Sequence, residues 1–153
     1  MSTTDYQNFS IEEVKPYNLK LSIAYLLIRY RVFIDEYKRK INQEFSLKDF
    51  KAKHYIFSIG AQRLGIVRII YENNKVELGR MAITRENRNA GYGSILISQI
   101  IAYIRSNSKI ESISLYTLDN SLISFYKKFG FIENGEVFFD AIPYMNMVKF
   151  FKR

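Results

Sequence analysis

Six consecutive residues do most to decide how this chain folds: Arg88-Asn89-Ala90-Gly91-Tyr92-Gly93. They follow a strand-like run from Val76 to Thr84 and precede a helix-like run from Ser94 to Arg105. A glycine-bearing turn that joins a strand to a helix leaves several backbone N–H groups free at the positive end of the helix dipole. Such a turn is suited to bind an anion, and phosphate groups in particular.

Two familiar phosphate-binding loops do not fit the spacing. A P-loop ends in Gly-Lys-Ser/Thr, whereas Gly93 is followed by Ser94-Ile95. A dinucleotide fingerprint needs a third glycine where this chain has Leu96, and it belongs to an early βαβ unit, which this segment lacks. The pattern that remains is Arg-x-x-Gly-x-Gly between a strand and an amphipathic helix.

The first half of the chain predicts a long helix among several strands. Pro16 breaks the chain after a short first strand, and Asn18 is a suitable N-cap for the helix. The apolar positions that recur at helical spacing are Leu19, Ile23, Leu26, Leu27, Tyr30, Phe33 and Ile34. A polar connection is expected over residues 38–53. The expected strands are 11–14, 54–59, 64–71 and 75–83.

The second half alternates between helices and strands. Helices are expected at residues 94–105 and 122–129, the latter ended by Gly130, with a strand at 112–118 between them. Two further strands, 131–139 and 144–151, are joined through Ala141-Ile142-Pro143. A strand, a helix and a second strand imply a right-handed parallel crossover. We therefore predict an α/β (α+β) fold with a mixed central sheet of about seven strands flanked by helices.

Composition narrows the class of protein. The 153 residues predict one domain, residues 9–153, behind a short polar N-terminal tail, residues 1–8. The absence of cysteine and the single histidine exclude disulfides, thiolate nucleophiles and a zinc cluster of the usual ligands, so no metal is expected. No run of residues has the features of a signal peptide or a membrane span, so we expect a cytoplasmic protein without a membrane partner.

The net charge of +8 is spread along the chain and is not gathered on one predicted helix face. Spread charge of this kind usually forms a solvated surface that aids solubility and weakly attracts polyanions. The sequence has no zinc-finger, RRM or KH signature, and its aromatic residues lie at spacings typical of a core. Nucleic acid is therefore not expected as a partner.

A second motif lies in the last predicted helix, Phe125-Tyr126-Lys127-Lys128-Phe129-Gly130-Phe131. Together with the glycine-bearing loop and the order of elements, it resembles the GNAT N-acetyltransferase superfamily over nearly the whole chain. Within that superfamily the chain is most similar to the ElaA-like branch. The features that carry this likeness are Arg31-Val32-Phe33, Glu36, His54, Gly79-Arg80 and Asp140-Ala141-Ile142-Pro143.

The resemblance implies acetyl-CoA as the cofactor. It implies that the loop at residues 88–94 binds the pyrophosphate of the cofactor. It also implies a bulge in the strand 75–83, whose freed backbone groups bind the thioester and pantetheine. Further cofactor contacts are expected from the last helix. The cofactor-binding residues expected on this basis are Met81, Ala82, Ile83, Arg88, Asn89, Ala90, Gly91, Tyr92, Gly93, Ser94, Asp119 and Phe125.

The resemblance also implies catalytic roles. Acetyl transfer to an amine needs a proton for the departing thiolate and a base for the attacking amine. Tyr126 is the candidate acid. Glu77 is a candidate base because it lies on the strand before the loop. His54 is the other candidate base, because the ordinary pKa of histidine, about 6.5, suits proton transfer near neutral pH. The choice between the two bases stays open.

The acceptor is expected to be a primary amine on a small molecule or a protein. The residues placed beside it are Phe33, Asp35, Glu36 and Arg80. Asp35, Glu36, Glu44 and Asp49 could attract a cationic amine such as a polyamine, or could balance nearby lysines. Two departures from the branch bear on the site: Tyr144 stands where it usually has histidine, and Asp119 stands where many members have a cofactor-binding asparagine.

The expected activity is therefore acetyl transfer from acetyl-CoA by direct attack in a ternary complex. The alternative is a catalytically silent module on the same scaffold that binds CoA or nucleic acid. The sequence leaves the identity of the acceptor and the oligomeric state open, with a homodimer among the alternatives.

Overall fold

The computed structural model describes residues 9–152, so the predicted N-terminal tail lies outside the described residues. The chain divides into two compact units. The first unit contains the described residues up to Ile70 together with Arg80–Leu96, and the second contains Tyr71–Gly79 and the chain from Ile97 onward.

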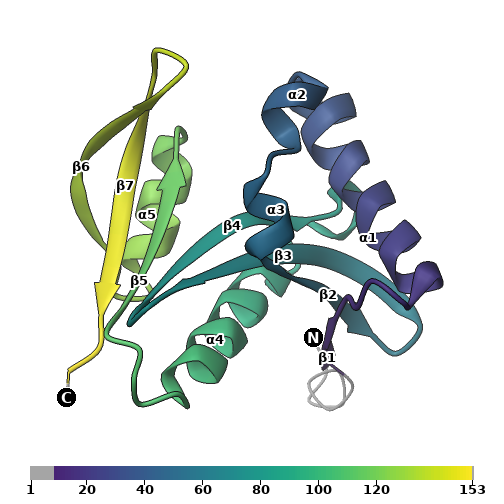
Figure 1. Ribbon diagram of the computed structural model, residues 1–153, viewed down its shortest axis with the longest axis horizontal. Coiled ribbons are helices and arrows are strands. Elements are labelled where there is room, and N and C mark those ends of the chain that lie inside the picture. The colour runs from purple at the N-terminus through teal and green to yellow at the C-terminus, as the bar shows by residue number, and fades with distance from the viewer. Residues whose placement is uncertain (1–8, 153) are drawn as a thin grey trace. The chain divides into compact units, whose positions relative to one another are not determined.

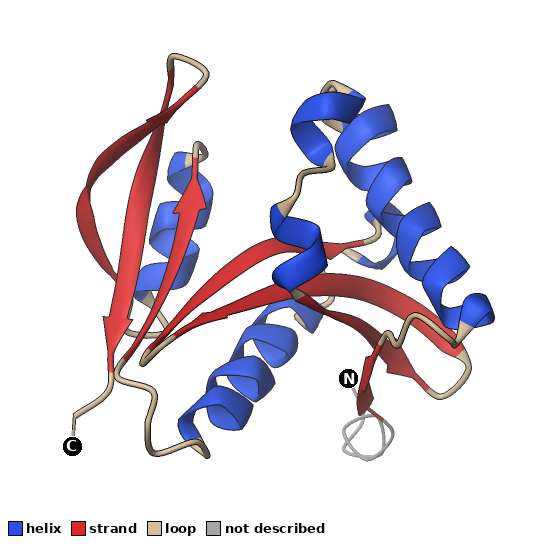
Figure 2. Ribbon diagram, viewed as in Figure 1, coloured by secondary structure: helices blue, strands red, loops and turns tan. Residues whose placement is uncertain are grey.

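Seven strands form one mixed sheet, as the sequence predicts (Figures 1 and 2). They are β1 (Phe9–Glu13), β2 (Lys53–Ile59), β3 (Gln62–Glu72), β4 (Lys75–Ile83), β5 (Ser112–Thr117), β6 (Ile132–Phe139) and β7 (Ile142–Phe150). Their order in the sheet is β1-β2-β3-β4-β5-β7-β6. β4 and β5 run parallel, and the pairs β1–β2, β2–β3, β5–β7 and β6–β7 are antiparallel. This is the sheet of the acyl-CoA N-acyltransferase fold, flanked by helices.

The helices agree with the predicted order, with additions. They are α1 (Leu19–Tyr30), α2 (Ile41–Glu44), α3 (Lys48–Lys51), α4 (Tyr92–Arg105) and α5 (Asn120–Lys127). A π-helical segment, η2 (Arg31–Glu36), continues α1, and a 3-10 turn, η3 (Arg85–Asn87), follows β4. Asn18 caps α1 as predicted, because its Oδ1 accepts from the N–H of Leu21 over 3.1 Å. The polar connection predicted over residues 38–53 contains the short helices α2 and α3.

The face of α1 that packs in the core is not the predicted one. Five residues of the predicted stripe have exposed fractions of 43 to 69%: Leu19, Ile23, Leu26, Leu27 and Tyr30. Phe33 of the predicted stripe is buried, but the residues that accompany it are Leu21, Ala24, Tyr25, Ile28 and Val32, packed with Ile56 of β2 and Ile66 of β3. Since α1 is apolar on two faces, its periodicity alone could not select the face that meets the sheet.

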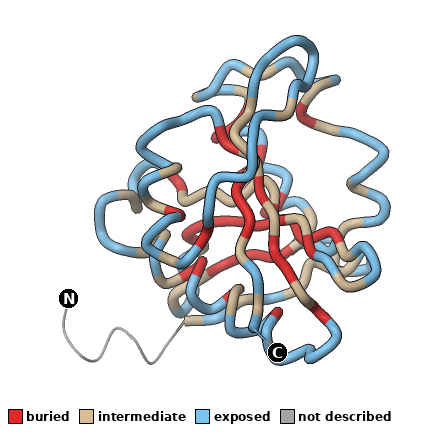
Figure 3. The backbone as a smooth tube through the Cα atoms, turned by 90° about the vertical axis from the view of Figure 1, so that its left-hand side faces the viewer, coloured by how far each residue is buried: buried red, intermediate tan, exposed pale blue. Residues whose placement is uncertain are grey.

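β3 and the end of β4 approach each other closely at Gly65, in the first unit. Gly65 and most of the other residues of β3 are buried, and Figure 3 colours buried residues red. A Cβ atom built on Gly65 would lie 2.3 Å from the carbonyl oxygen of Ala82, which is far inside van der Waals contact. The N–H of Thr84 also donates to the carbonyl oxygen of Leu64 over 2.8 Å. Only glycine therefore fits at this position without moving the end of β4.

Replacing Gly65 with alanine is expected to destabilise the protein by about 1–3 kcal/mol, because the new methyl group overpacks the strand pair. Urea denaturation of Gly65→Ala and of the parent measures the difference. Ser10→Ala, which changes an exposed residue of β1, is the control and is expected to stay within about 0.5 kcal/mol of the parent. Equal midpoints for Gly65→Ala and the parent would show that β4 can move away at no cost.

In the second unit, α5 packs against β5, β6 and β7. The ring of Tyr126 on α5 meets that of Phe131 edge to face, with centroids 5.7 Å apart. Gly130, with a φ angle of 82°, lets the chain turn after α5, as predicted. The link before β7 is shorter than expected: Asp140 and Ala141 make the turn with φ angles of 49° and 63°, and Ile142 and Pro143 already belong to β7.

Among residues 9–152, no helix has both the length and the apolar character that a membrane span requires.

Candidate active site

The loop between β4 and α4 has the geometry expected of an anion-binding turn. Asn89 and Gly91 have left-handed backbone conformations, with φ angles of 61° and 81°. The N–H of Ile95 donates to the carbonyl oxygen of Gly91 over 3.2 Å, so Gly91 leads directly into α4. A Cβ atom on Gly91 would meet no described atom within 4 Å. The space beside Gly91, at the N-terminus of α4, is therefore free for a ligand.

The other predicted loop residues lie in the same segment. Ala90 is exposed, and Tyr92, Gly93 and Ser94 form the first turn of α4. The ring of Tyr92 meets that of Phe9 on β1 edge to face, with centroids 6.1 Å apart. Tyr92 therefore packs toward β1, and its contribution to a cofactor site would come from its backbone N–H.

Arg88 is held in place by Glu36 at the end of η2. Its Nε donates to the carbonyl oxygen of Ile83 over 2.9 Å, its Nη2 donates to Glu36 Oε2 over 3.0 Å, and its Nη1 donates to Glu36 Oε1. The hydrogen bond from Arg88 lowers the pKa of Glu36, and the same bond raises the pKa of Arg88. A guanidinium has five N–H groups, so these contacts leave Arg88 able to donate to an anion as well.

A cleft of about 510 Å³ lies between η2, which continues α1, and the segment that follows β4. It is lined by Arg31, Val32, Asp35, Glu36, Lys38, Thr84, Arg85 and Glu86. The structure thus brings Asp35 and Glu36, both predicted beside the acceptor, next to the start of the loop. Its basic and acidic lining residues balance in number, so the cleft does not carry the acidic excess expected to attract a cationic amine.

Arg80 lies within β4, just before the residues expected to contact the thioester. Its φ angle is 51°, in the left-handed region that non-glycine residues seldom adopt. Its Nε donates to Glu44 Oε1 over 2.8 Å, and its guanidinium lies 5.8 Å from the ring centroid of Phe33. β4 is therefore irregular immediately before Met81, where the bulge is predicted, and Met81, Ala82 and Ile83 are half-buried beyond it.

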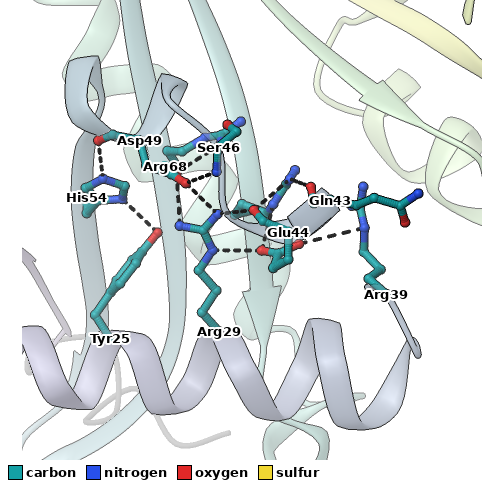
Figure 4. A network of polar contacts seen from close by, with 10 residues as sticks. Tyr25, Arg29, Arg39, Gln43, Glu44, Ser46, Asp49, His54 and Arg68 are labelled. Atoms are coloured by element: carbon teal, nitrogen blue, oxygen red, sulfur yellow. Dashed lines mark hydrogen bonds and ion pairs between the residues drawn. The ribbon is translucent and has the colours of Figure 1, made fainter. Parts of the chain in front are cut away.

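A network of charged side chains lies inside the first unit, between α1, α2, α3 and the sheet (Figure 4). Arg29 on α1 is only 1% exposed and Glu44 is 0% exposed. Arg29 Nε donates to Glu44 Oε1 over 2.7 Å, and its Nη1 donates to Asp49 Oδ1 over 3.0 Å. Arg68 on β3 reaches the same Asp49 oxygen over 3.0 Å. The network ties α2 and α3 to α1 and the sheet.

Asp49 is strongly held as the anion. Burial alone would raise its pKa, but hydrogen bonds from Arg29, from the N–H of Ser46 and from Arg68 outweigh burial and lower it to about 2. Asp49 and Glu44 were candidates for attracting a cationic acceptor, and the structure instead pairs both of them with arginines.

His54 has both ring nitrogens engaged in this network. Its Nδ1 lies 2.9 Å from the hydroxyl of Tyr25, and its Nε2 lies 3.0 Å from the carbonyl oxygen of Asp49. Because the carbonyl can only accept, Nε2 carries the proton and Nδ1 accepts from Tyr25. Burial lowers the pKa of His54, and burial raises the pKa of Tyr25 to about 12. This geometry is typical of a neutral, structural histidine.

The second unit carries Glu77 and Tyr126. Glu77 lies on β4 opposite Ser114 of β5 and is half-buried. Burial raises the pKa of Tyr116, two residues further along β5, and the charges of Glu77 and Glu72 raise it further. Tyr126 is 7% exposed on α5.

Asp119 and Phe125 also lie in the second unit, at α5. Asp119 is the N-cap of α5, and its Oδ1 accepts from the N–H of Ser121 over 2.7 Å. Hydrogen bonding to Ser121 lowers the pKa of Asp119. Its carboxylate is thus used locally to start the helix. The ring of Phe125 packs against Tyr126, with centroids 5.2 Å apart.

Sequence reasoning missed the arginines of the buried network. Arg29 occupies a core position of α1, four residues after Tyr25 and eight after Leu21. Because arginine is seldom buried unless it is paired, its place among core residues could have indicated a buried ion pair. Its partners stand 15 and 20 residues away in the polar connection, where no periodicity marks them.

Comparison with known proteins agrees with this geometry. The family model of the acetyltransferase (GNAT) domain matches residues 51–133, more than half of the chain. The chain therefore belongs to the GNAT acetyltransferases, a family of acyltransferases. A search of curated proteins gave no significant match.

Solved structures share the fold at low sequence identity. ElaA of Escherichia coli is 20% identical, with a TM-score of 0.77 over 92% of this chain and 99% of that chain. An acyl-CoA N-acyltransferase from Pseudomonas aeruginosa is 22% identical, with a TM-score of 0.77 over 92% of this chain and 97% of that chain. Spermidine N-acetyltransferase from Vibrio cholerae, solved with CoA and spermine, is 15% identical, with a TM-score of 0.69 over 94% of this chain and 95% of that chain.

Proposed function

We propose that this protein transfers an acetyl group from acetyl-CoA to a primary amine by direct attack in a ternary complex. The observation that carries the proposal is the loop after β4. Gly91 has a left-handed backbone conformation beside space free of described protein atoms at the N-terminus of α4, and Arg88 stands three residues before it. In a member of the GNAT family, this is the arrangement that a pyrophosphate requires.

The cofactor contacts follow the chain through the loop. Backbone N–H groups from Gly91 to Ser94 would bind the pyrophosphate, and Arg88 would add charge-assisted hydrogen bonds while Glu36 holds its orientation. Met81, Ala82 and Ile83 would offer backbone groups to the thioester and pantetheine, beyond the irregular residue Arg80. The V. cholerae enzyme of the same fold was solved with CoA, which supports this cofactor.

For proton transfer, Tyr126 would protonate the departing thiolate and Glu77 would take the proton of the amine. The hydrogen bonds of His54 favour Glu77 over His54 as the base, because His54 would have to give up the bond from Tyr25 in order to act. Asp119 is the weakest of the proposed cofactor contacts, since its carboxylate already caps α5.

The Gly91→Val variant is expected to lose at least about 100-fold in affinity for acetyl-CoA while the domain stays folded. A β-branched side chain there would fill the space proposed for the pyrophosphate, and three lost charge-assisted hydrogen bonds would each contribute about 1.5–3 kcal/mol. Isothermal titration with acetyl-CoA at fixed moderate salt measures the dissociation constant, and circular dichroism checks the fold.

Gly135→Val is the matched control. Gly135 has a φ angle of 85°, and a Cβ atom on it would likewise meet nothing within 4 Å, so the variant carries the same backbone strain away from the loop. We expect Gly135→Val to bind acetyl-CoA like the parent. Unchanged affinity in a folded Gly91→Val protein would remove the loop from the cofactor site.

The ElaA-like branch and a cytoplasmic location are part of the same proposal. The rival is a silent CoA-binding module, and it would be favoured by tight acetyl-CoA binding without transfer to any amine. The release of free CoA thiol in the presence of a broad panel of amines distinguishes the two.

A further inference from the structure

Three aromatic rings are in contact on one face of the second unit, where β5, β7 and β6 are neighbours in the sheet (Figure 1). Tyr116 of β5 and Phe139 of β6 meet edge to face with ring centroids 5.1 Å apart, and Phe139 meets Tyr144 of β7 edge to face at 5.3 Å. Tyr116 is also the register partner of Asn146 on β7. Because side chains alternate along a strand, Asn146 projects on the same side of the sheet as the rings. These four residues form the aromatic face.

Ligands can reach the aromatic face because it is only partly covered by protein. Phe139 is 41% exposed, and the other three residues are half-buried. Leu115 and Met147, which pair with each other and point to the opposite side, are 4% and 0% exposed. The opposite side of β5 and β7 is therefore packed in the core, and the aromatic face is the accessible side.

Asn146 has a hydrogen-bond acceptor that no described residue uses. Its Oδ1 is shielded from solvent and makes no hydrogen bond within the described part of the chain. Buried polar atoms are normally satisfied, and an unsatisfied one is destabilising. A small movement of the half-buried side chains would bring Oδ1 to a donor on a bound ligand, so Asn146 indicates a ligand that carries N–H or O–H groups.

Two carboxylates act on the aromatic face. Glu77 of β4 pairs with Ser114 of β5, two residues before Tyr116, so its side chain projects on the same side of the sheet. Burial raises the pKa of the Tyr116 phenol, and the charges of Glu77 and Glu72 raise it further. The electrostatic field at Tyr116 is therefore negative, which favours a cation over an anion.

Basic residues are scarce on this side of the sheet. β5 and β6 contain none, and Lys149 of β7 pairs with Ile113 on the opposite side. Lys75 of β4 is on the same side as the aromatic face, but it pairs with Ser112, four residues before the tyrosine of β5. The aromatic face thus combines carboxylate charge, ring faces and an amide oxygen, and all three attract a cation that donates hydrogen bonds.

We propose that the aromatic face binds the acceptor as its ammonium ion, and that this acceptor carries no acidic group next to its nitrogen. The inference rests on the proposed acetyltransferase function, in which Glu77 takes the proton of the amine. The ammonium lies against the negative π-face of Tyr116 and donates one N–H to Asn146 Oδ1. A carboxylate on the neighbouring carbon would meet the same ring faces and the charges of Glu77 and Glu72. Amino acids are therefore excluded as acceptors, and alkylamines and arylalkylamines are accepted.

The test compares acceptors that differ only in a carboxylate: 2-phenylethylamine with phenylalanine, and isobutylamine with valine. Release of CoA thiol by the full chain at saturating acetyl-CoA gives kcat/KM for each. For the pair that reacts, we expect kcat/KM for the amine to exceed that for the amino acid by at least about 10-fold, the factor that corresponds to one cation–π contact of a desolvated ion. Equal values, or a preference for the amino acid, would overturn the proposal.

Variants separate the ring and the amide from general effects. Tyr116→Leu and Asn146→Leu should each raise KM for the amine about 10-fold without changing the dissociation constant for acetyl-CoA. Tyr116→Phe should recover most of the loss, because it keeps the π-face. Phe50→Leu, which removes an 89% exposed ring from α3, is the control and should leave KM unchanged. Equal KM values for Tyr116→Leu and the parent, or equal losses in Tyr116→Leu and Tyr116→Phe, would overturn the role of the ring.

Failure of the proposed function has a different signature. If no amine is acetylated, titration of the CoA-saturated protein at pH 7 with 2-phenylethylamine and with 2-phenylethanol tests the cation site directly, since only the amine is charged at that pH. Tighter binding of the amine, lost in Tyr116→Leu, would support the site while the acetyltransferase proposal falls. Equal heats for the two probes, or a difference that Tyr116→Leu leaves unchanged, would overturn the site.

Discussion

Glu44→Gln is expected to destabilise the protein by about 3–5 kcal/mol, because it leaves buried arginines without their counter-charge. Glu44 is 0% exposed, and its carboxylate accepts from Arg29 over 2.7 Å and from Arg80 over 2.8 Å. Glutamine keeps the size of the side chain, so the loss measures charge and not a cavity. A loss of this size is a large fraction of the total stability of a typical domain, about 5–15 kcal/mol. Urea denaturation followed by circular dichroism measures the difference.

The control is Glu12→Gln, which removes a charge from an exposed position on β1 and should change the unfolding free energy by less than about 0.5 kcal/mol. A double variant with Arg80→Gln extends the test. Because the two side chains are in direct contact, their effects should not add, and the second change should cost less in the Glu44→Gln background. Additive effects, or a Glu44→Gln variant as stable as the parent, would show that water or other groups compensate the arginines.

This network also marks the limit of what the sequence could predict. The order of strands and helices, the caps at Asn18 and Gly130, and the turn at Gly91 between β4 and α4 follow from local patterns, and the structure confirms them. The role of this turn in binding the cofactor stays a prediction. Such features depend on a few neighbouring residues, so their causes are visible in the sequence. The family could be predicted for the same reason, because each of its motifs is a short run of consecutive residues, 88–93 and 125–131.

The predictions that were wrong concern choices made by distant residues. The outer stripe of α1 was expected to be buried, but the sheet packs against the other apolar face, and no residue of α1 itself encodes that choice. Glu44 and Asp49 were expected either to attract a cationic acceptor or to balance nearby lysines, whereas their partners are arginines far away in sequence. The short helices α2 and α3 form where these ion pairs fix the chain, and helices of four residues have too little periodicity to be detected.

Tyr126→Phe is expected to lower kcat by about 10²–10⁴ while the dissociation constant for acetyl-CoA stays unchanged. The ring of Tyr126 packs against Phe125 and Phe131, with centroids 5.2 and 5.7 Å away, and phenylalanine preserves both contacts. Only the hydroxyl is removed. If that hydroxyl protonates the thiolate of CoA, the variant has no acid for the leaving group and the chemical step is slower. Binding of acetyl-CoA precedes this step, so its dissociation constant should not change.

The measurement is a single-turnover rate for thiol release with saturating acceptor, since product release can hide a slower chemical step in kcat. Tyr17→Phe, which alters a tyrosine that is 86% exposed, is the control and should react at the parent rate. The parent rate should fall at high pH, where a catalytic acid has lost its proton, and this fall should be missing in Tyr126→Phe. A variant with the single-turnover rate and the pH profile of the parent would assign the proton to water and leave Tyr126 as a packing residue of α5.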